Sequence, residues 1–285
     1  MSQQQSILEY KNGRYLKLAI GLCALAIGAY LWYEPTTVYV KPNGGTWLGY
    51  TLGTIGAVLI LWLMLLGVRK RRYRSRAGSL QGWTSAHVYI GTSLLVIVTL
   101  HCAFEFGWNV HTAAYVLMVL VIVSGFFGVY AYLRYPALMT ANLHDAQVET
   151  IVLKIADLDR KCRRMALDLP DEVNEIVMKS SRASLREPRV RTSFRRRLAG
   201  DTVHCPTRDA CAALTRIGAK FTGESASLNQ QLLTAMTQKS VMIDQLRRDR
   251  RYRAILEIWL VAHVPLSFAL LATLIAHVVS VFYFW

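Results

Sequence analysis

Four histidines in two apolar segments have the residue type and the spacing of metal ligands. They form two pairs whose members are fourteen residues apart, His87 with His101 and His263 with His277. Fourteen residues make about 3.9 turns of an α-helix, so both members of a pair face nearly the same way, roughly 21 Å apart along the axis. Imidazole is an axial ligand of haem iron, and helical bundles hold haem between facing side chains. Two such helices side by side predict two stacked b-type haems.

The segments that carry these histidines are expected to cross a membrane. The chain of 285 residues is 53% hydrophobic yet has a net charge of +15, and the apolar and basic residues are segregated along it. Five segments approach or exceed the ~20 apolar residues that a transmembrane helix needs. They are residues 16–33, 47–68, 83–106, 112–135 and 254–285. We therefore predict an all-α membrane protein whose five transmembrane helices form a haem-binding bundle.

The predicted helices divide the chain into three regions. Residues 1–135 hold four transmembrane helices, residues 136–253 form a basic insertion, and residues 254–285 form the fifth transmembrane helix. Helical periodicity runs through residues 143–178, with a break at Pro170, and again through residues 228–258. The pattern predicts that the insertion is an α-helical hairpin in the cytoplasm.

The distribution of Lys and Arg predicts the orientation. Residues 69–76 and the insertion are strongly basic, whereas residues 34–46 carry one lysine and residues 107–111 carry no basic residue. The positive-inside rule then places the amino terminus in the cytoplasm and the carboxyl terminus in the periplasm, across a bacterial-type inner membrane. The first apolar segment is too long for a cleaved signal peptide and lacks a small-residue cleavage site, so we expect it to be retained.

With this orientation, His87 and His263 would hold the cytoplasmic-side haem, and His101 and His277 would hold the periplasmic-side haem. Ionisable groups at membrane depth are costly and mark function. A proton relay would interleave carboxylates with the histidines, and a zinc transporter would place His and Asp three or four residues apart at mid-membrane. Neither pattern is present in the sequence.

Three glycines near the histidines are candidates for haem packing. Gly91 follows His87 by one turn, and Gly125 and Gly128 give the fourth segment a thin face. Such glycines are equally common in ordinary contacts between membrane helices, and both interpretations stay open.

Two polar residues lie near the predicted periplasmic end. His111 is a candidate ligand of a third haem, a replacement for His101, a quinone or propionate contact, or a plain interfacial residue. Glu105 follows His101 by four residues, on the same face of the predicted helix. It is a candidate proton acceptor for quinol oxidation beside Phe104 and Phe106, and the alternative is a surface carboxylate in an aromatic belt.

The insertion contains two further features. His204, Cys205 and Cys211 are spaced unlike common zinc or iron–sulfur frameworks, so a reduced cysteine pair without metal is the expected state. Residues 181–198 are rich in arginine, including Arg195, Arg196 and Arg197. Beside a membrane, such a patch favours anionic lipids or an acidic redox partner over nucleic acid.

The paired histidines resemble those of cytochrome b in quinol-oxidising bc-type complexes and of ferric-reductase and NADPH-oxidase membrane domains. The matching stretches are Ala-His-Val-Tyr at 86–89, Thr-Leu-His-Cys at 99–102, Ala-His-Val-Pro at 262–265 and Ile-Ala-His-Val at 275–278. The resemblance covers the third to fifth segments and implies two haems between two helices. It does not extend to a quinol-site signature or to a flavin- or nicotinamide-binding domain, so it does not imply a substrate.

These patterns predict a di-haem b-type cytochrome subunit that transfers electrons across the membrane. Two imidazoles on each iron leave it six-coordinate, which favours electron transfer over oxygen binding. The expected donors are the membrane quinol pool or a cytoplasmic flavin or iron–sulfur protein, and the expected acceptor is a periplasmic cytochrome c or other redox subunit. A bound quinone and a third haem through His111 stay open. The alternatives are a self-contained quinone or ferric reductase and a non-redox membrane anchor or sensor.

Overall fold

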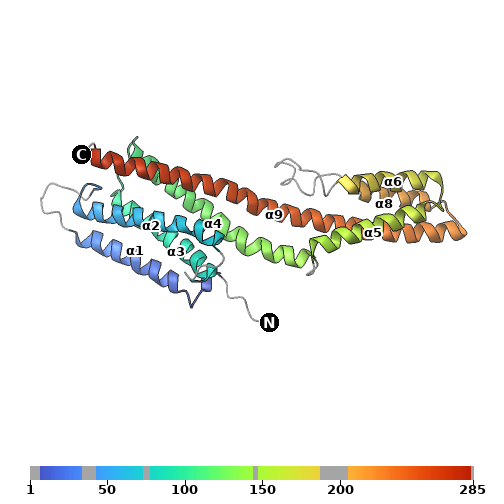
Figure 1. The fold of residues 1–285 in the computed structure, drawn as a ribbon, viewed down its shortest axis with the longest axis horizontal. Helices are drawn as coiled ribbons and strands as arrows, with labels where there is room; N and C mark the ends of the chain where they lie inside the picture. Colours follow the sequence, from blue (N-terminus) through green and yellow to red (C-terminus); the bar gives the residue numbers. More distant parts are fainter. Residues whose placement is uncertain (1–6, 34–42, 73–77, 144–146, 187–204, 284–285) are drawn as a thin grey trace. The chain divides into compact units, whose positions relative to one another are not determined.

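The computed structural model describes residues 7–33, 43–72, 78–143, 147–186 and 205–283. Within these ranges the secondary structure is helical throughout, and no strand is found (Figure 1). Five of the described helices are long and apolar enough to cross a membrane. The chain is therefore an all-α, multi-pass membrane protein, which confirms the fold class predicted from its composition.

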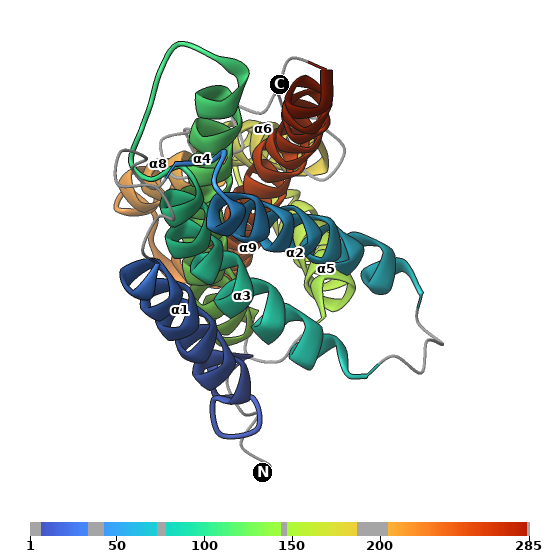
Figure 2. The ribbon, with the colours of Figure 1, turned by 90° about the vertical axis from the view of Figure 1, so that its left-hand side faces the viewer.

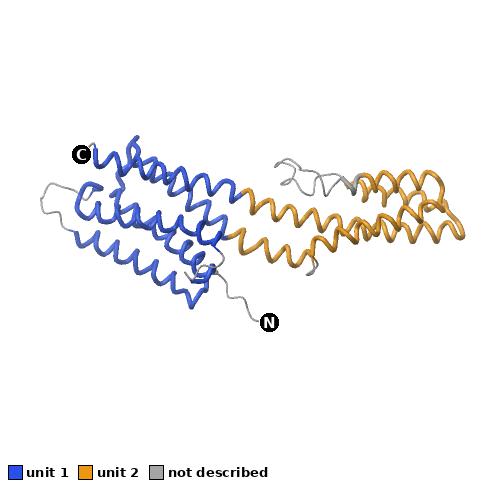
Figure 3. Tube along the Cα trace, viewed as in Figure 1, with its two compact units in different colours: residues 1–129, 259–285 blue, residues 130–258 orange. Residues whose placement is uncertain are grey.

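The chain forms two compact units (Figure 3). Unit 1 comprises residues 1–129 and 259–285, and unit 2 comprises residues 130–258. Unit 1 contains α1 (Arg14–Trp32), α2 (Trp47–Arg71), α3 (Leu80–His101), the first part of α4 (Val110–Leu143) and the last part of α9 (Gly223–Tyr283). The predicted apolar segments thus fall on these helices, and α4 and α9 continue well beyond them.

Side-chain caps and close packing set the arrangement of α1, α2 and α3. Thr46 Oγ1 accepts the Gly49 N–H at the start of α2, and Ser79 Oγ accepts the Gly82 N–H at the start of α3, which satisfies donors that a helix leaves unpaired. Helix α3 packs along both α1 and α2 (Figure 2). It is the central helix of these three, so its side chains reach neighbours on two sides.

Large apolar side chains cover the outside of unit 1. Leu25 is 72% exposed, Val261 68% and Phe268 60%. In water this surface would drive association, whereas a bilayer is an apolar solvent for it. The exposed faces therefore agree with a membrane environment, and the buried side chains mark the interior of the helix bundle.

Helix α3 ends at His101, five residues before the predicted end. Ala103 and Phe104 have φ angles of 48° and 62°, a left-handed conformation that ends an α-helix. This cap is usually a glycine, and here no glycine occupies it, so the sequence carried no signal for it. The chain then continues through a turn in which Glu105 N–H donates to the Cys102 carbonyl at 2.9 Å.

Unit 2 contains the end of α4, the helices α5 (Val148–Ala166), α6 (Asp171–Arg186) and α8 (Pro206–Gly218), and the first part of α9. Pro170 separates α5 from α6, as predicted. Helix α8 was not expected in a simple hairpin, although Pro206 in its first turn is a residue that favours helix starts. The packed interior draws on α5, α6, α8 and α9, with fully buried Cys162, Val173, Leu214 and Leu232.

A lysine and an aspartate lie inside unit 2. Lys239 is fully buried, and its Nζ donates to Asp159 Oδ1 at 2.5 Å. Asp159 Oδ2 accepts from Ser181 Oγ at 2.6 Å, and Ser180 Oγ donates to Thr207 Oγ1 at 3.0 Å. A buried charge is tolerated only when it is paired and hydrogen-bonded. These hydrogen bonds link α5, α6, α8 and α9, and a buried ion pair of this kind adds little net stability.

Candidate functional site

The structure brings His101 of α3 and His277 of α9 together. Their ring centroids are 6.0 Å apart and their planes are 85° to each other. Two axial imidazoles on one iron would hold their centroids roughly 6 Å apart, because each metal–nitrogen bond is about 2 Å long. The separation of these two rings is thus compatible with one metal ion between them.

His87 of α3 and His263 of α9 are the second predicted pair. Between the two pairs, Leu94 and Leu270 belong to one buried cluster. Each leucine stands seven residues from both histidines of its own helix, so α3 and α9 are in matched register. The pairing predicted from sequence, His87 with His263 and His101 with His277, agrees with this register.

Backbone carbonyls of α2 hold the two histidines of α3. His87 Nδ1 is 3.1 Å from the Leu63 carbonyl oxygen, and His101 Nδ1 is 2.8 Å from the Gly49 carbonyl oxygen. A carbonyl only accepts, so each Nδ1 must carry the proton and donate. The lone pair of each neutral ring is then on Nε2, the arrangement that metal-bound histidines show.

The two carbonyls repeat the spacing of the histidines. Gly49 and Leu63 are fourteen residues apart on α2, as His101 and His87 are on α3. Because α2 and α3 run in opposite directions, the start of α2 meets the end of α3. The α2–α3 packing therefore serves both histidines at once, and sliding one helix along the other would break both hydrogen bonds.

Gly53 makes room for the His101 ring. A Cβ atom at this position would lie 2.7 Å from His101 Cε1 and 2.9 Å from His101 Nδ1, closer than real side chains approach. A residue with any side chain would push the imidazole away from α2. The sequence predicts a thin face of the second apolar segment at Gly49, Gly53 and Gly56 that could let a porphyrin approach, and the fold shows that Gly53 is the one whose missing side chain leaves room for the His101 ring.

Ser124 of α4 holds His263. Ser124 Oγ lies 2.8 Å from the Val121 carbonyl and 2.7 Å from His263 Nδ1. Its single proton is donated to the carbonyl, so the hydroxyl oxygen accepts a hydrogen bond from the His263 Nδ1–H. Trp259 Nε1 donates to the Ser124 carbonyl at 2.7 Å, and its indole lies 5.3 Å from the His263 ring. The Ser124 hydroxyl therefore holds His263 with its proton on Nδ1, the same tautomer as His87 and His101.

His111 contacts the fourth histidine. Its Nδ1 is hydrogen-bonded to Nδ1 of His277, and the two ring centroids are 4.5 Å apart at an angle of 89°. His111 is thus beside the His101–His277 pair, as its position in the sequence allowed. Each of the four predicted ligands has a polar partner at Nδ1.

The three predicted glycines lie in different surroundings. At Gly125 a Cβ atom would be 3.8 Å from His263 Cε1, in ordinary contact. At Gly128 it would be 2.0 Å from Trp259 Cζ2, so this glycine accommodates the indole. At Gly91 it would be 3.7 Å from a Leu63 methyl group. Only Gly125 of the three therefore adjoins a candidate ligand.

Glu105 does not share a helix face with His101. Helix α3 ends at His101, and Glu105 is exposed in the following turn. The same-face argument for a proton acceptor was therefore wrong, because it assumed that the helix continued. Phe106 packs on Tyr115 with centroids 4.8 Å apart, while the Trp108 side chain is exposed.

The cysteines of the insertion are in unit 2. Cys205 is buried and Cys211 partly buried, and neither forms a disulfide. Their predicted partner His204, and Arg195, Arg196 and Arg197, lie outside the described residues. Among the residues that the structure does describe, no group of three or more His, Cys, Asp or Glu side chains is arranged to hold a metal ion. Haem needs only two protein ligands for each iron.

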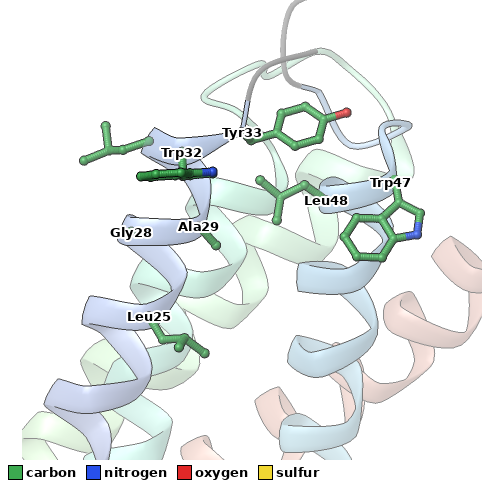
Figure 4. Close-up of a pocket in the computed structure, with 8 residues that line it drawn as sticks. Leu25, Gly28, Ala29, Trp32, Tyr33, Trp47 and Leu48 are labelled. Carbon is green, nitrogen blue, oxygen red and sulfur yellow. The ribbon is translucent and has the colours of Figure 1, made fainter. Parts of the chain in front are cut away.

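A pocket of about 1060 Å³ lies between the end of α1 and the start of α2. Figure 4 shows its lining, which is apolar and aromatic and includes Leu25, Trp32, Trp47 and Leu48. Leu48 also packs in one cluster with Ile97 and Leu100 of α3. The pocket wall is thus continuous with the segment that carries His101.

The imidazole donors suit haem ligation, most directly at the His101–His277 pair. The pairs are in register, one pair has a suitable ring separation, and hydrogen bonds to Leu63, Gly49 and Ser124 leave three Nε2 lone pairs available. No protein-family model matches the chain, and neither a curated protein nor a solved structure does so.

Proposed function

We propose that this protein is a di-haem b-type cytochrome that transfers electrons across the membrane. The observation that carries the proposal is the matched set of hydrogen bonds to the imidazoles of α3. Free histidines in a bundle have no need of a common tautomer, whereas iron ligation through Nε2 requires a proton on Nδ1. Histidines held by their Nδ1 protons are typical of metal sites.

In this proposal His87 and His263 hold one haem, and His101 and His277 hold the other. Haem bound by two imidazoles supplies a reversible one-electron centre without an open coordination position. The chain orients the imidazoles through α2 and α4, keeps them in an apolar bundle and separates the two levels by Leu94 and Leu270. The resemblance to cytochrome b and to ferric-reductase and NADPH-oxidase membrane domains agrees with this assignment.

The electron partners follow from the orientation that we propose, with the amino terminus in the cytoplasm of a bacterial-type inner membrane. The donor is quinol, or a flavin or iron–sulfur protein that meets the basic insertion, and the acceptor is a periplasmic redox protein such as a cytochrome c. Quinol is the candidate donor that is dissolved in the membrane, and Trp32, Tyr33 and Trp47 place aromatic side chains around an open groove at the end of α1.

Visible spectroscopy of the purified full-length chain tests the proposal. We expect a reduced-minus-oxidised spectrum with a b-type α-band and two haems per chain. His101→Leu or His277→Leu should remove one haem and retain the other, and His87→Leu or His263→Leu should remove the other one. Phe268→Leu, at a lipid-exposed position of α9, is the matched control and should keep both.

A folded chain without haem would contradict the proposal and favour a membrane anchor or sensor. Rapid reduction of the purified chain by a quinol, followed by direct reduction of ferric iron, would favour the self-contained reductase. Two haems that are both lost in each single variant would contradict the separate pairing of the histidines.

A further inference from the structure

His111 is the second residue of α4 and follows a turn that side-chain hydrogen bonds close. Thr112 N–H donates to Asn109 Oδ1 at 2.9 Å, and Gly107 N–H donates to Thr112 Oγ1 at 3.1 Å. These bonds shape the turn from which α4 starts. The His111 imidazole is thereby placed against His277, with Nδ1 of each ring hydrogen-bonded to the other.

Such a bond has a defined direction if His277 ligates iron. A bond between two Nδ1 atoms needs a proton on one ring and a lone pair on the other. A neutral His277 that uses Nε2 as its ligand atom carries its proton on Nδ1, so His277 donates and His111 accepts. Nδ1 of His111 is then engaged, and its own proton is on Nε2.

We propose that His111 is a positioning residue that orients His277 and sets the properties of the haem at the His101–His277 pair. The inference rests on the proposed function and adds a role for a histidine that is not itself a ligand. The Nδ1 partners of the other three histidines are two carbonyls and a hydroxyl. An imidazole nitrogen is a stronger base than any of these, so it draws the Nδ1 proton further from His277.

A stronger pull on this proton makes His277 a more electron-rich ligand. Such a ligand favours the ferric over the ferrous state, and the reduction potential of this haem is lowered by the contact. The His87–His263 haem lacks an imidazole acceptor at the positions shown, so it serves as an internal reference within the same molecule.

The experiment compares His111→Leu, His111→Gln and the wild type as purified full-length chains. Haem content, a redox titration of each haem and the EPR signals of the ferric state are measured. For His111→Leu we expect two low-spin haems, a positive shift in the potential of the His101–His277 haem, a changed EPR signal for that haem alone, and roughly 10- to 100-fold weaker retention of it. In His111→Gln the glutamine amide oxygen can still accept a hydrogen bond. The reduction potential of the His101–His277 haem in this variant should lie between those of the wild type and His111→Leu.

Val116→Ala is the matched control, since Val116 lies on α4 and is 48% exposed. It should change neither haem. Unchanged potential and EPR signals in both His111 variants would overturn the inference. Conversion of the His101–His277 haem to a high-spin form would also overturn it, because His111 would then be an axial ligand. A wild-type chain without haem at this pair would refute the proposed function itself, which separates the two failures.

Discussion

Leu94 and Leu270 occupy one buried cluster, at the midpoints of the two histidine pairs. Leu94 is 3% exposed and Leu270 6%. We expect the packing of this cluster to hold α3 and α9 in register, so it bears on both pairs. A substitution at Leu94 or Leu270 should therefore affect both haem sites, whereas a substitution of one histidine should affect one.

Leu94→Ala should weaken both haem sites together. Replacing a buried leucine by alanine costs about 2–5 kcal/mol through lost contacts and a residual cavity. The measurement is the release of each haem as denaturant concentration rises, followed by visible absorbance. Selective loss of one haem would contradict a shared register. Leu95→Ala, one residue along the helix at a 37% exposed position, is the control.

Gly53→Ala should displace the His101 ring and disturb only its haem. The added methyl group would lie 2.7 Å from His101 Cε1, so the imidazole must move away from the Gly49 carbonyl. We expect a lower content of the His101–His277 haem or a changed EPR signal from it. Gly67→Ala, on the same helix with open space around it, should leave both haems unaffected. Normal spectra for Gly53→Ala would show that His101 is not held against α2.

Ser124→Ala should alter the His87–His263 haem. The substitution removes the oxygen that accepts from His263 Nδ1 but keeps the carbonyl that binds Trp259. Loss of such a partner typically costs 10–100-fold in metal affinity, and the potential of this haem should rise. A redox titration that resolves the two haems is the measurement. Thr273→Ala, whose hydroxyl bonds only to carbonyls of its own helix in the hydrogen bonds described here, is the comparison.

Lys239→Met should destabilise unit 2 by as much as about 3–5 kcal/mol, since it leaves the buried Asp159 carboxylate to a longer, 3.4 Å ion pair with the partly exposed Arg163. The double substitution Lys239→Met with Asp159→Leu removes both charges and should recover much of the loss. Limited proteolysis of the full-length chain over a range of urea concentrations measures the effect on the helices of unit 2. Equal loss in the single and double variants would argue against the ion pair as the cause.

Cys211 should react slowly with thiol reagents at neutral pH. Burial raises the pKa of its thiol, and a hydrogen bond with Thr237 offsets part of this rise. The raised pKa favours the protonated, folded form, so its stabilising contribution is complete below the ordinary thiol pKa of about 8.5 and is lost as pH rises through the raised value. Alkylation rates from pH 7 to pH 10, with peptide mapping, should show a later onset in the folded chain than in the denatured one. Coincident curves would show that the thiol is accessible.

The sequence was sufficient to predict five long apolar helices and to place the four histidines in pairs on two of them. Long apolar runs and a fourteen-residue spacing between histidines can be recognised from the order of residues alone. The partners of the histidines could not be predicted in the same way. Leu63 and Gly49 contribute backbone carbonyls, which every residue possesses, and Gly53 is one of several glycines on α2. The early end of α3 was missed because Ala103 and Phe104 adopt a conformation that their side chains disfavour.

The backbone carbonyls of Gly49 and Leu63 limit what mutagenesis can test at this site. A scan that replaces one side chain at a time can remove the hydroxyl of Ser124 or the imidazole of His111, but it cannot delete the oxygens of Gly49 and Leu63. Two of the four Nδ1 partners of the histidines are therefore backbone oxygens, which substitution of a side chain cannot remove. Exchange of single amides for esters, which weakens a chosen carbonyl as an acceptor, would expose them.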